Sequence, residues 1–321
     1  MTLSQLRTFA LVVKLGSLHA AAAILGVSEP AVSSALAALR RDLGDPLYVR
    51  AAGGIALTPG GRALAVHAQE IVGIADQARR EVSHAQSSSV GLRVLATAAF
   101  AEHAAGRLLD AFTRRVPGLS LDVVVEPAED VAALLAEHAY DIALGVRPPS
   151  SSSQSMDVVP VLRYHRVLVA AARHRLATRG GAVTETNLLG CTWFAGPTGI
   201  EEATEEGRWI ARLSGIPAVV QLSSETDALA AVRAGEGIML ALSHNARAEI
   251  ENGTLMRLPL AGTPISGLWW ASTLGQERAA PAAQALQRFA TTAEATAAML
   301  APGGSRGLAR RGSQVRVALW S

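Results

Sequence analysis

The residues whose types and spacing best suit specific recognition lie in the segment GSLHAAAAILGVSEPAVSSALAALRRDLGDPLYVR, residues 16–50. From Ser28 onward, small and polar side chains recur at a spacing that places them on one face of a helix. The candidates are Ser28, Glu29, Pro30, Ser33, Ser34, Ala37 and Arg41, with Arg50 in the hairpin that follows. Hydroxyl, carboxylate and guanidinium groups of this kind contact base edges and phosphates in the grooves of DNA. The segment therefore predicts a DNA-binding surface.

A second set of residues follows apolar segments in the C-terminal part of the chain and suits the binding of a small molecule. Ligands of open α/β sheets lie beyond the carboxyl ends of strands, near helix N-termini. This rule selects Thr97, Ala98, Ala99, Arg147, Pro197, Thr198, Gly199 and Thr226. The threonines supply hydroxyls and Arg147 suits a carboxylate, so the expected effector is a small organic anion. Each threonine could instead be an ordinary helix cap, and Arg147 could form a structural salt bridge.

Residues for catalysis or for a metal are not brought together by any recognisable motif. The GEG at 235–237 lacks the third glycine of a dinucleotide fingerprint, and neither a P-loop nor a nucleophile elbow occurs. The eight histidines are scattered, without an HExxH pair. The single cysteine, Cys191, excludes an intrachain disulfide and a Cys-rich metal site, and it fits a reducing cytoplasm. We expect no enzyme activity, no cofactor and no metal.

Three short helices and a hairpin are predicted to position the DNA-binding residues. The first helix covers 3–15 and ends at Gly16, and the second covers 18–25 and is capped by Ser17. Gly26 then supplies a tight turn, and Ser28 caps a third helix. The predicted buried stripe of that helix is Val32, Leu36, Leu39 and Leu43. Two helices joined by so short a turn, followed by a β-hairpin wing over PLYVRAAGGIALTPGG, form the geometry that enters a major groove.

An N-terminal export signal would also be rich in alanine and leucine. Here Lys14 and His19 interrupt the apolar run, and the helical spacing continues beyond the AAAA that resembles a cleavage site. No apolar run approaches the ~20 residues of a membrane span. Net charge does not by itself indicate a nucleic-acid binder, because residues 1–90 contain eight Lys and Arg and six Asp and Glu. We therefore favour a DNA-binding element over a leader.

A long helix is predicted to follow as a linker over 61–88. Its apolar residues step by four and three, as in a two-helix seam: Leu64, Ala68, Ile71, Ala75, Ala78 and Val82. A lone helix of ~25 residues has little in water against which to bury this stripe. We expect a dimer interface between two DNA-binding heads, although the stripe could also pack on its own domain.

From Leu92 the pattern changes to strands alternating with helices, which predicts parallel sheets with crossover helices. Among these elements we expect a strand over RVLVAAA from Arg166, a helix from about Ile200 to Leu213 and a helix near 281–300. Two such units form a two-lobed α/β domain over 89–301. One lobe takes about 89–160 and 268–301, and the other takes about 161–267. The tail 302–321 holds four cations, no acids and no periodicity, so we expect it to be disordered and weakly attracted to phosphate.

Residues 1–60 resemble the winged helix-turn-helix of LysR-type transcriptional regulators. The matching pieces are LRTFALVVKLGSLHAAAAILGVSEPAVSSAL, LGDPLYVR and LTPGG, in this order and at these spacings. The two-lobed region resembles the effector-binding domain of the same family, itself similar to periplasmic binding proteins, so the resemblance covers about 1–300. It implies a cytoplasmic regulator that binds double-stranded promoter DNA as a dimer of dimers (a homotetramer) and responds to a small effector between its lobes, with no membrane association.

The chain departs from the family pattern at the start of the third helix. Glu29 stands where the family usually carries Gln, and Ser34 and Ala35 stand where a basic or amide residue is common. A glutamate can accept from cytosine N4 but repels phosphate. It could also merely favour the helix N-terminus through the helix dipole. These departures leave room for another reading, a cytoplasmic small-molecule-binding protein whose N-terminal helices serve assembly only.

Overall fold

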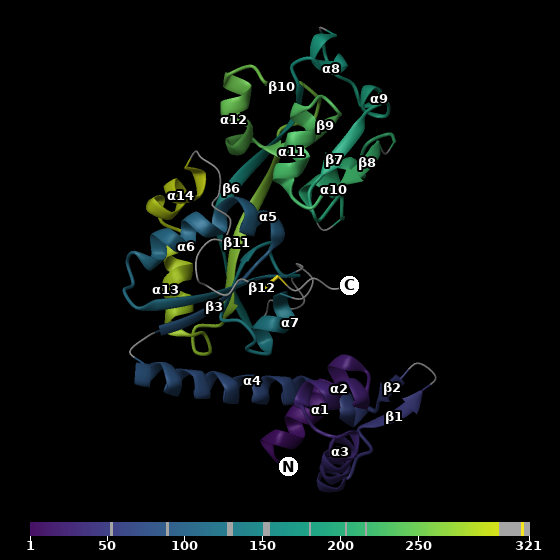
Figure 1. Cartoon of the computed structure of the whole chain (residues 1–321), viewed down its shortest axis with the longest axis vertical. Helices are drawn as coiled ribbons and strands as arrows, with labels where there is room; N and C mark the ends of the chain where they lie inside the picture. The colour runs from purple at the N-terminus through teal and green to yellow at the C-terminus, as the bar shows by residue number, and fades with distance from the viewer. Residues whose placement is uncertain are drawn as a thin grey trace. The chain divides into compact units, whose positions relative to one another are not determined.

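The computed structural model describes residues 1–51, 54–87, 90–126, 131–149, 155–179, 181–202, 204–215, 217–301 and 316–317 (Figure 1). The chain divides into two compact units. One contains Met1–Gly91 with Ala133–Tyr140, and the other contains Leu92–Ala132 with Asp141–Ser321. Among the described residues, no single helix is long and apolar enough to cross a membrane. The helices Leu18–Leu25 and Glu29–Leu43 reach that composition only as a pair, across a bend of 108°.

Three short helices begin the first unit, and the local sequence sets their ends. They are α1 (Leu3–Leu15), α2 (Leu18–Leu25) and α3 (Glu29–Leu43). Each is capped by a hydroxyl that accepts a backbone N–H, from Thr2, Ser17 and Ser28. Each ends at a glycine in the left-handed region, with φ of 64° at Gly16, 65° at Gly26 and 67° at Gly44. The predicted helices, their serine caps and their first two glycine ends are confirmed.

One apolar core holds these helices together. It is built around Leu6, Phe9, Val12, Ala21, Val32, Leu36 and Leu39, all of which are buried. The predicted inner stripe of α3 is therefore confirmed for its first three members. It is wrong for Leu43, which is 43% exposed, because the helix ends there and extends past the core.

The predicted wing is present as β1 (Tyr48–Ala51) and β2 (Gly54–Leu57), paired antiparallel. Asp45 fixes its base, since one carboxylate oxygen accepts from the Leu47 backbone N–H at 2.6 Å and from the Thr58 hydroxyl at 2.7 Å. These hydrogen bonds lower the pKa of Asp45. A side chain at Gly61 would collide with the backbone of Leu47, so only glycine fits there. This packing explains why the LGDPLYVR and LTPGG pieces occur together.

The linker helix α4 spans Pro59–Ser87, slightly more than predicted. Its first turns pack into the core of the first unit through Leu64, Ala65, Ala68 and Val72. Thr58 supports its start by accepting the Gly61 N–H at 2.9 Å. The N-terminal part of the predicted seam is therefore buried within its own domain, which was the alternative interpretation for this helix.

A mixed sheet of ten strands runs through the second unit. The strands are β3 (Val90–Ala96), β4 (Leu119–Val125), β5 (Ile142–Gly145), β6 (Met156–Ala171), β7 (Thr192–Ala195), β8 (Ala218–Gln221), β9 (Ile238–Leu242), β10 (Leu255–Arg257), β11 (Ile265–Leu274) and β12 (Arg316–Val317). Their order is β12-β4-β3-β5-β11-β6-β9-β7-β8, with β10 beside β6. The pairs β3–β5, β7–β8 and β7–β9 are parallel, whereas β6 and β11 pair antiparallel with each other over most of their length.

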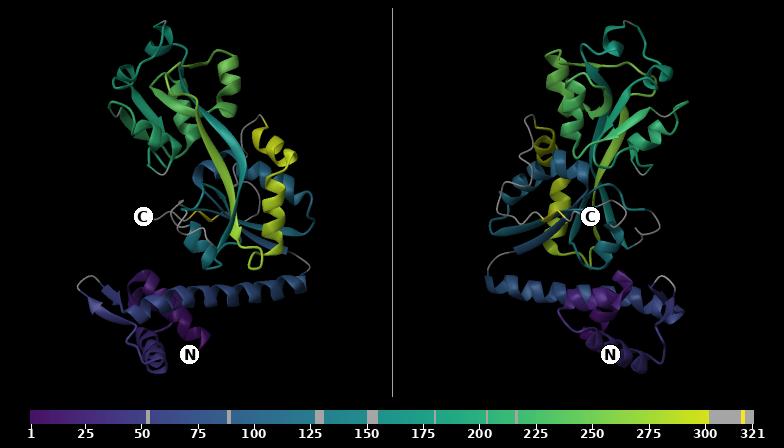
Figure 2. Two further views of the ribbon diagram at one scale, coloured as in Figure 1. Left: turned by 180° about the vertical axis from the view of Figure 1, so that it is seen from behind. Right: turned by 45° about the vertical axis from the view of Figure 1, so that its right-hand side comes forward.

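The two long strands β6 and β11 pass between two lobes, as both views in Figure 2 show. The first lobe contains β3–β5 with α5 (Ala98–Phe100), a π-helical turn η1 (Ala101–Ala105), α6 (Gly106–Thr113), α13 (Pro281–Ala290) and α14 (Ala293–Leu300). The short helix α7 (Val131–Ala136) follows β4 in the chain, and its residues from Ala133 on are grouped with the first unit. The second lobe contains β7–β10 with α8 (Arg175–Thr178), α9 (Glu185–Leu188), α10 (Glu205–Ile210), α11 (Glu225–Arg233) and α12 (Ser243–Glu251). The predicted two-lobed α/β architecture is confirmed.

Each lobe has its own core. Phe100, Phe112 and Trp269 belong to the core of the first lobe. In the second lobe, alternate residues of β6 and β9 face two separate cores, so that Leu168 packs on one side of the sheet and Val169 on the other. Both faces are covered by apolar side chains, which is why these strands read as continuous apolar runs.

Several predicted boundaries differ from the structure. The helix predicted from Ile200 to Leu213 is the shorter α10, which begins at Glu205 after its cap Thr204. Gly199, with φ of 57°, instead lies in a turn. β6 begins at Met156, ten residues before the predicted strand, and the helix predicted near 281–300 is broken after Ala290.

The tail 302–321 lies outside the described residues except for Arg316–Val317. These two form β12 and pair in parallel with Val124–Val125 of β4. For the tail as a whole, disorder stays a prediction.

Candidate nucleic-acid interface and ligand cavity

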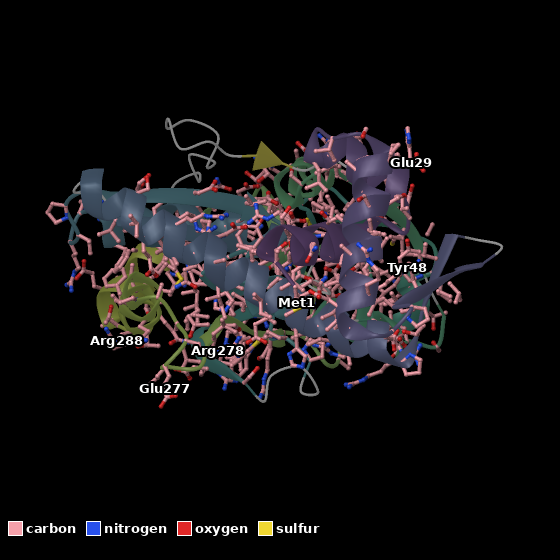
Figure 3. The ribbon with its side chains drawn as sticks, turned by 90° about the horizontal axis from the view of Figure 1, so that it is seen from below. Met1, Glu29, Tyr48, Glu277, Arg278 and Arg288 are labelled. Atoms are coloured by element: carbon pink, nitrogen blue, oxygen red, sulfur yellow. The ribbon has the colours of Figure 1, made fainter. Side chains whose placement is uncertain are left out.

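The outer face of α3 gathers the predicted DNA-contacting residues on one exposed surface. Ser28, Glu29, Pro30, Ser33, Ser34, Ala37 and Arg41 are all exposed, opposite the buried Val32, Leu36 and Leu39. Figure 3 labels Glu29 at one end of this helix. Arg50 pairs through its backbone with Ile55 in the wing, and its side chain lies outside the described residues. A helix with this division of faces can place its small outer side chains against base edges.

Two contacts join α3 to its neighbours, one to the wing and one to α2. Arg40 of α3 donates to the Tyr48 carbonyl at 3.1 Å, and its guanidinium lies 3.9 Å from the centre of the Tyr48 ring, so wing and helix are tied together. Glu29 lies 3.5 Å from the ring of His19 on α2. Both of these side chains are largely exposed, so this ion pair contributes little to stability.

The linker helix exposes its predicted seam only from Ile71 onward. Of the six predicted seam residues, Leu64 and Ala68 pack in the core of the first unit. Further along, Ile71 is 41% exposed and Val82 is 62% exposed, with Ala75 and Ala78 between them on the same side of the helix. The structure therefore divides the predicted seam into a buried and an exposed part.

A cavity of about 640 Å³ lies between the two lobes of the second unit. Six of the eight predicted effector residues line it, namely Thr97, Ala98, Ala99, Arg147, Pro197 and Thr198. They come from Thr97 and the start of α5 after β3, from the segment after β5 and from the turn after β7, which is the strand-end placement that the sequence predicted. The Thr97 hydroxyl does not cap α5, although a cap was one reading of that residue.

The other two predicted residues are not among those lining the cavity. Gly199 donates its backbone N–H to the Gly196 carbonyl at 2.8 Å and belongs to the turn that carries Thr198. Thr226 lies in the first turn of α11, and its hydroxyl donates to the carboxylate of Glu102 at 2.5 Å. Its hydroxyl is therefore engaged in a contact between the lobes.

Arginine and tryptophan side chains shape one part of the cavity wall. The guanidinium of Arg147 lies 4.9 Å from the centre of the Trp270 ring. Arg163 lines the same cavity from β6. Neither Arg147 nor Arg163 has a carboxylate within ion-pair distance among the described residues. Within the described part of the chain, neither cation is thus committed to an ion pair.

A buried ionic cluster forms another part of the wall, and sequence reasoning missed it. Arg166 of β6 is 5% exposed and donates from Nε to Glu205 at 2.8 Å. Its two terminal nitrogens donate to the two carboxylate oxygens of Glu225 at 2.7 and 3.1 Å. Beside it, the Trp193 indole donates to Glu206 at 2.8 Å. One signal was readable, because an arginine inside the apolar strand RVLV needs a buried partner.

Burial and neighbouring charges shift the pKa values of this cluster in opposite directions. Burial raises the pKa of Glu206 to about 8, so this carboxyl is protonated at neutral pH. Burial also acts to raise the pKa of Glu225, but Arg166 and then His103 outweigh it and hold that pKa well below its usual range. Beside one guanidinium, Glu225 is therefore ionised and Glu206 is neutral.

Metal chemistry has no obvious place in the described part of the chain. There, no three His, Cys, Asp or Glu side chains gather closely enough to hold an ion. Cys191 is buried and lies 3.1 Å from a terminal nitrogen of Arg175. Burial raises the pKa of its thiol despite that cation, which suits a structural rather than a reactive cysteine.

Comparison with known proteins agrees with this geometry in both units. Residues 3–62 match the model for the bacterial regulatory helix-turn-helix protein of the lysR family, and residues 85–295 match the LysR substrate binding domain. An uncharacterized HTH-type transcriptional regulator of Mycobacterium tuberculosis is 37% identical over the full length of both chains. That relative is named as a regulator rather than an enzyme, as expected for this chain.

Two solved structures share the fold. ArgP from Mycobacterium tuberculosis matches with a TM-score of 0.63 and 21% identity, over 90% of this chain and 97% of its own. Full-length CbnR in complex with its target DNA matches with a TM-score of 0.56 and 20% identity, over 90% of this chain and 100% of its own. The resemblance read from the sequence is confirmed, and this chain belongs to the LysR family of transcriptional regulators.

Proposed function

We propose that this regulator reads promoter DNA with the outer face of α3 and the wing, in the cytoplasm, where promoter DNA is accessible. The observation that carries the proposal is the division of α3 into a buried stripe and an exposed face of small and polar residues. Its structural neighbour CbnR was solved with target DNA. A small-molecule-binding protein whose first helices serve assembly alone would have no need of this exposed face, so that alternative is not favoured.

The test changes the α3 face while keeping net charge matched. Ser33→Glu places a carboxylate on the face, and Gln276→Glu adds the same charge to an exposed position in the other unit. We expect Ser33→Glu to weaken binding to DNA from upstream of the protein's own gene by about tenfold, because contacts in the groove are lost and the new carboxylate repels phosphate. Gln276→Glu should leave affinity unchanged in the same anisotropy titration. Equal effects would contradict the assignment of the face.

Assembly would follow from the exposed half of the α4 seam. Two copies pairing through Ile71, Ala75, Ala78 and Val82 would bury side chains that water now reaches. A dimer of dimers would place recognition helices at half-sites about one helical turn apart, ~34 Å. We therefore propose a homotetramer on DNA.

The cavity between the lobes is proposed to hold a small organic effector with an anionic group. Arg147 and Arg163 are the cations available to it, and the hydroxyls of Thr97 and Thr198 line the same space. The effector would act by favouring one arrangement of the lobes over another. In a thermal-shift screen of small carboxylates, Arg147→Ala should abolish stabilisation that the native protein shows, without changing DNA affinity. An unchanged shift would place the anion elsewhere.

A further inference from the structure

Two successive side chains of the first lobe reach across to the second lobe. Glu102 and His103 lie in η1, a single π-helical turn between α5 and α6. Such turns insert one extra residue into a helix and occur often at functional sites. In Figure 1, α5 and α11 mark the neighbourhood in which the two lobes approach each other. The turn thus places an acid and an imidazole at the contact between lobes.

Glu102 caps a helix that belongs to the opposite lobe. Its carboxylate accepts the backbone N–H of Glu225 at 2.9 Å and that of Thr226 at 2.7 Å. Within α11 itself, the Ser224 hydroxyl accepts the N–H of Asp227 at 2.9 Å. An anion at a helix N-terminus is favoured both by these free N–H groups and by the helix dipole. Most of this cap therefore depends on the position of the other lobe.

His103 adds a second contact between the lobes and links it to the cavity. Nε2 of His103 lies 3.0 Å from a carboxylate oxygen of Glu225, to which it donates, and the Asn245 amide nitrogen lies 2.7 Å from Nδ1 of the same ring. Glu225 in turn holds the terminal nitrogens of Arg166, which lines the cavity. His103, Arg166 and Glu225 are each less than a tenth exposed. A continuous hydrogen-bonded path therefore joins the lobe contact to the cavity wall.

We propose that Glu102 and His103 are positioning residues that latch the lobes together and couple the lobe angle to the effector cavity through Glu225 and Arg166. The proposal rests on the proposed effector function of that cavity. A rotation of the lobes must pull Glu102 from α11 and His103 from Glu225. Because Glu225 then loses a hydrogen-bond partner, the hydrogen bonds that Arg166 makes to Glu225 and to Glu205 change as well. Buried polar networks of this kind have discrete arrangements rather than a continuous range.

The test separates a latch from a simple helix cap. Hydrogen exchange is measured on the full chain without DNA or effector for Glu102→Ala, for Glu102→Gln and for Ser224→Ala, which removes a cap of α11 that lies within one lobe. Exchange in α13 serves as the reference for overall stability. We expect Glu102→Ala to raise exchange about tenfold in both α11 and α10, with a smaller rise for Glu102→Gln. Ser224→Ala should raise exchange in α11 alone.

The decisive signal is α10, which carries Glu205 and Glu206 on the cavity wall. If both Glu102 variants change hydrogen exchange in α11 only, or change exchange in α10 no more than in α13, the proposed coupling is overturned. DNA affinity of the same variants is measured separately by anisotropy. The latch can therefore fail while DNA binding holds, and loss of specific DNA binding by the native chain would instead count against the proposed function.

Discussion

At the scale of single residues, the two sites differ in how far the sequence reveals them. The α3 face could be predicted because its members lie within fourteen positions and follow one helical period. The buried cluster could not, because Glu102 and Glu225 are 123 positions apart and only the packed lobes bring them together. Arg166 was visible as a cation in an apolar strand, but its partners were not.

Glu29 gives a prediction that the family resemblance alone does not. Its carboxylate stands exposed at the start of α3, where phosphates of bound DNA would lie. We expect Glu29→Gln to tighten binding to an unrelated duplex by about threefold, because a repulsive charge is removed. His19→Gln, which removes only the ion-pair partner, should change this affinity little. If Glu29→Gln weakens binding to the upstream DNA and leaves the unrelated duplex unchanged, Glu29 reads a base instead.

Glu206 predicts how stability depends on pH. Its pKa is about 8 in the folded protein, against an ordinary value of 4.5. Between these values the folded state keeps a proton that the unfolded chain releases. The free energy of unfolding therefore falls as pH rises through this range and levels off above it, by an amount on the order of a few kcal/mol.

Replacing Glu206 by a residue that does not titrate tests this dependence of stability on pH. Glu206→Gln keeps an oxygen for the Trp193 indole but carries no titrating proton. In urea unfolding at pH 5 and pH 8, the native protein should lose more stability between the two conditions than the variant. Equal losses in both proteins would show that Glu206 ionises normally in the folded state.

At the scale of elements, local sequence signals predicted the ends of the first three helices well and the lengths of later helices and strands poorly. Hydroxyl caps and left-handed glycines fixed α1–α3 because those interactions lie within a few residues of each helix end. Thr198 and Gly199 gave a similar signal but form a turn, and α10 starts later, at Glu205 after its cap Thr204. β6 extends to Met156 because it pairs with β11, a partner about a hundred residues away that its own pattern does not reveal.

The α4 helix gives an element-scale prediction about assembly. Its exposed stripe is predicted to pair with a second copy, and a charge buried there would lack a partner. We expect Ile71→Glu to weaken self-association at least about tenfold in sedimentation velocity. Val66→Glu adds the same charge at a 65% exposed position on another side of the helix and should leave assembly intact. Dissociation by both variants would contradict a defined seam.

At the scale of the whole molecule, the order of the parts was predictable and their coupling was not. Sequence motifs predicted the helix-turn-helix with its wing and the linker helix, and the alternation of strands and helices predicted the two-lobed α/β domain. The family models match both folded parts. The contacts by which one lobe caps a helix of the other arise only in the folded second unit. Sequence patterning is local, whereas the proposed response to an effector depends on such long-range contacts.

The measurement that tests the central claim most directly is fluorescence anisotropy of the full chain on DNA from upstream of its own gene. An unrelated duplex of equal length and a salt series run alongside. We expect tighter binding to the upstream DNA, by about a hundredfold or more, and a steep fall in affinity with salt. Equal and weak binding to both duplexes would contradict the account of a sequence-reading regulator.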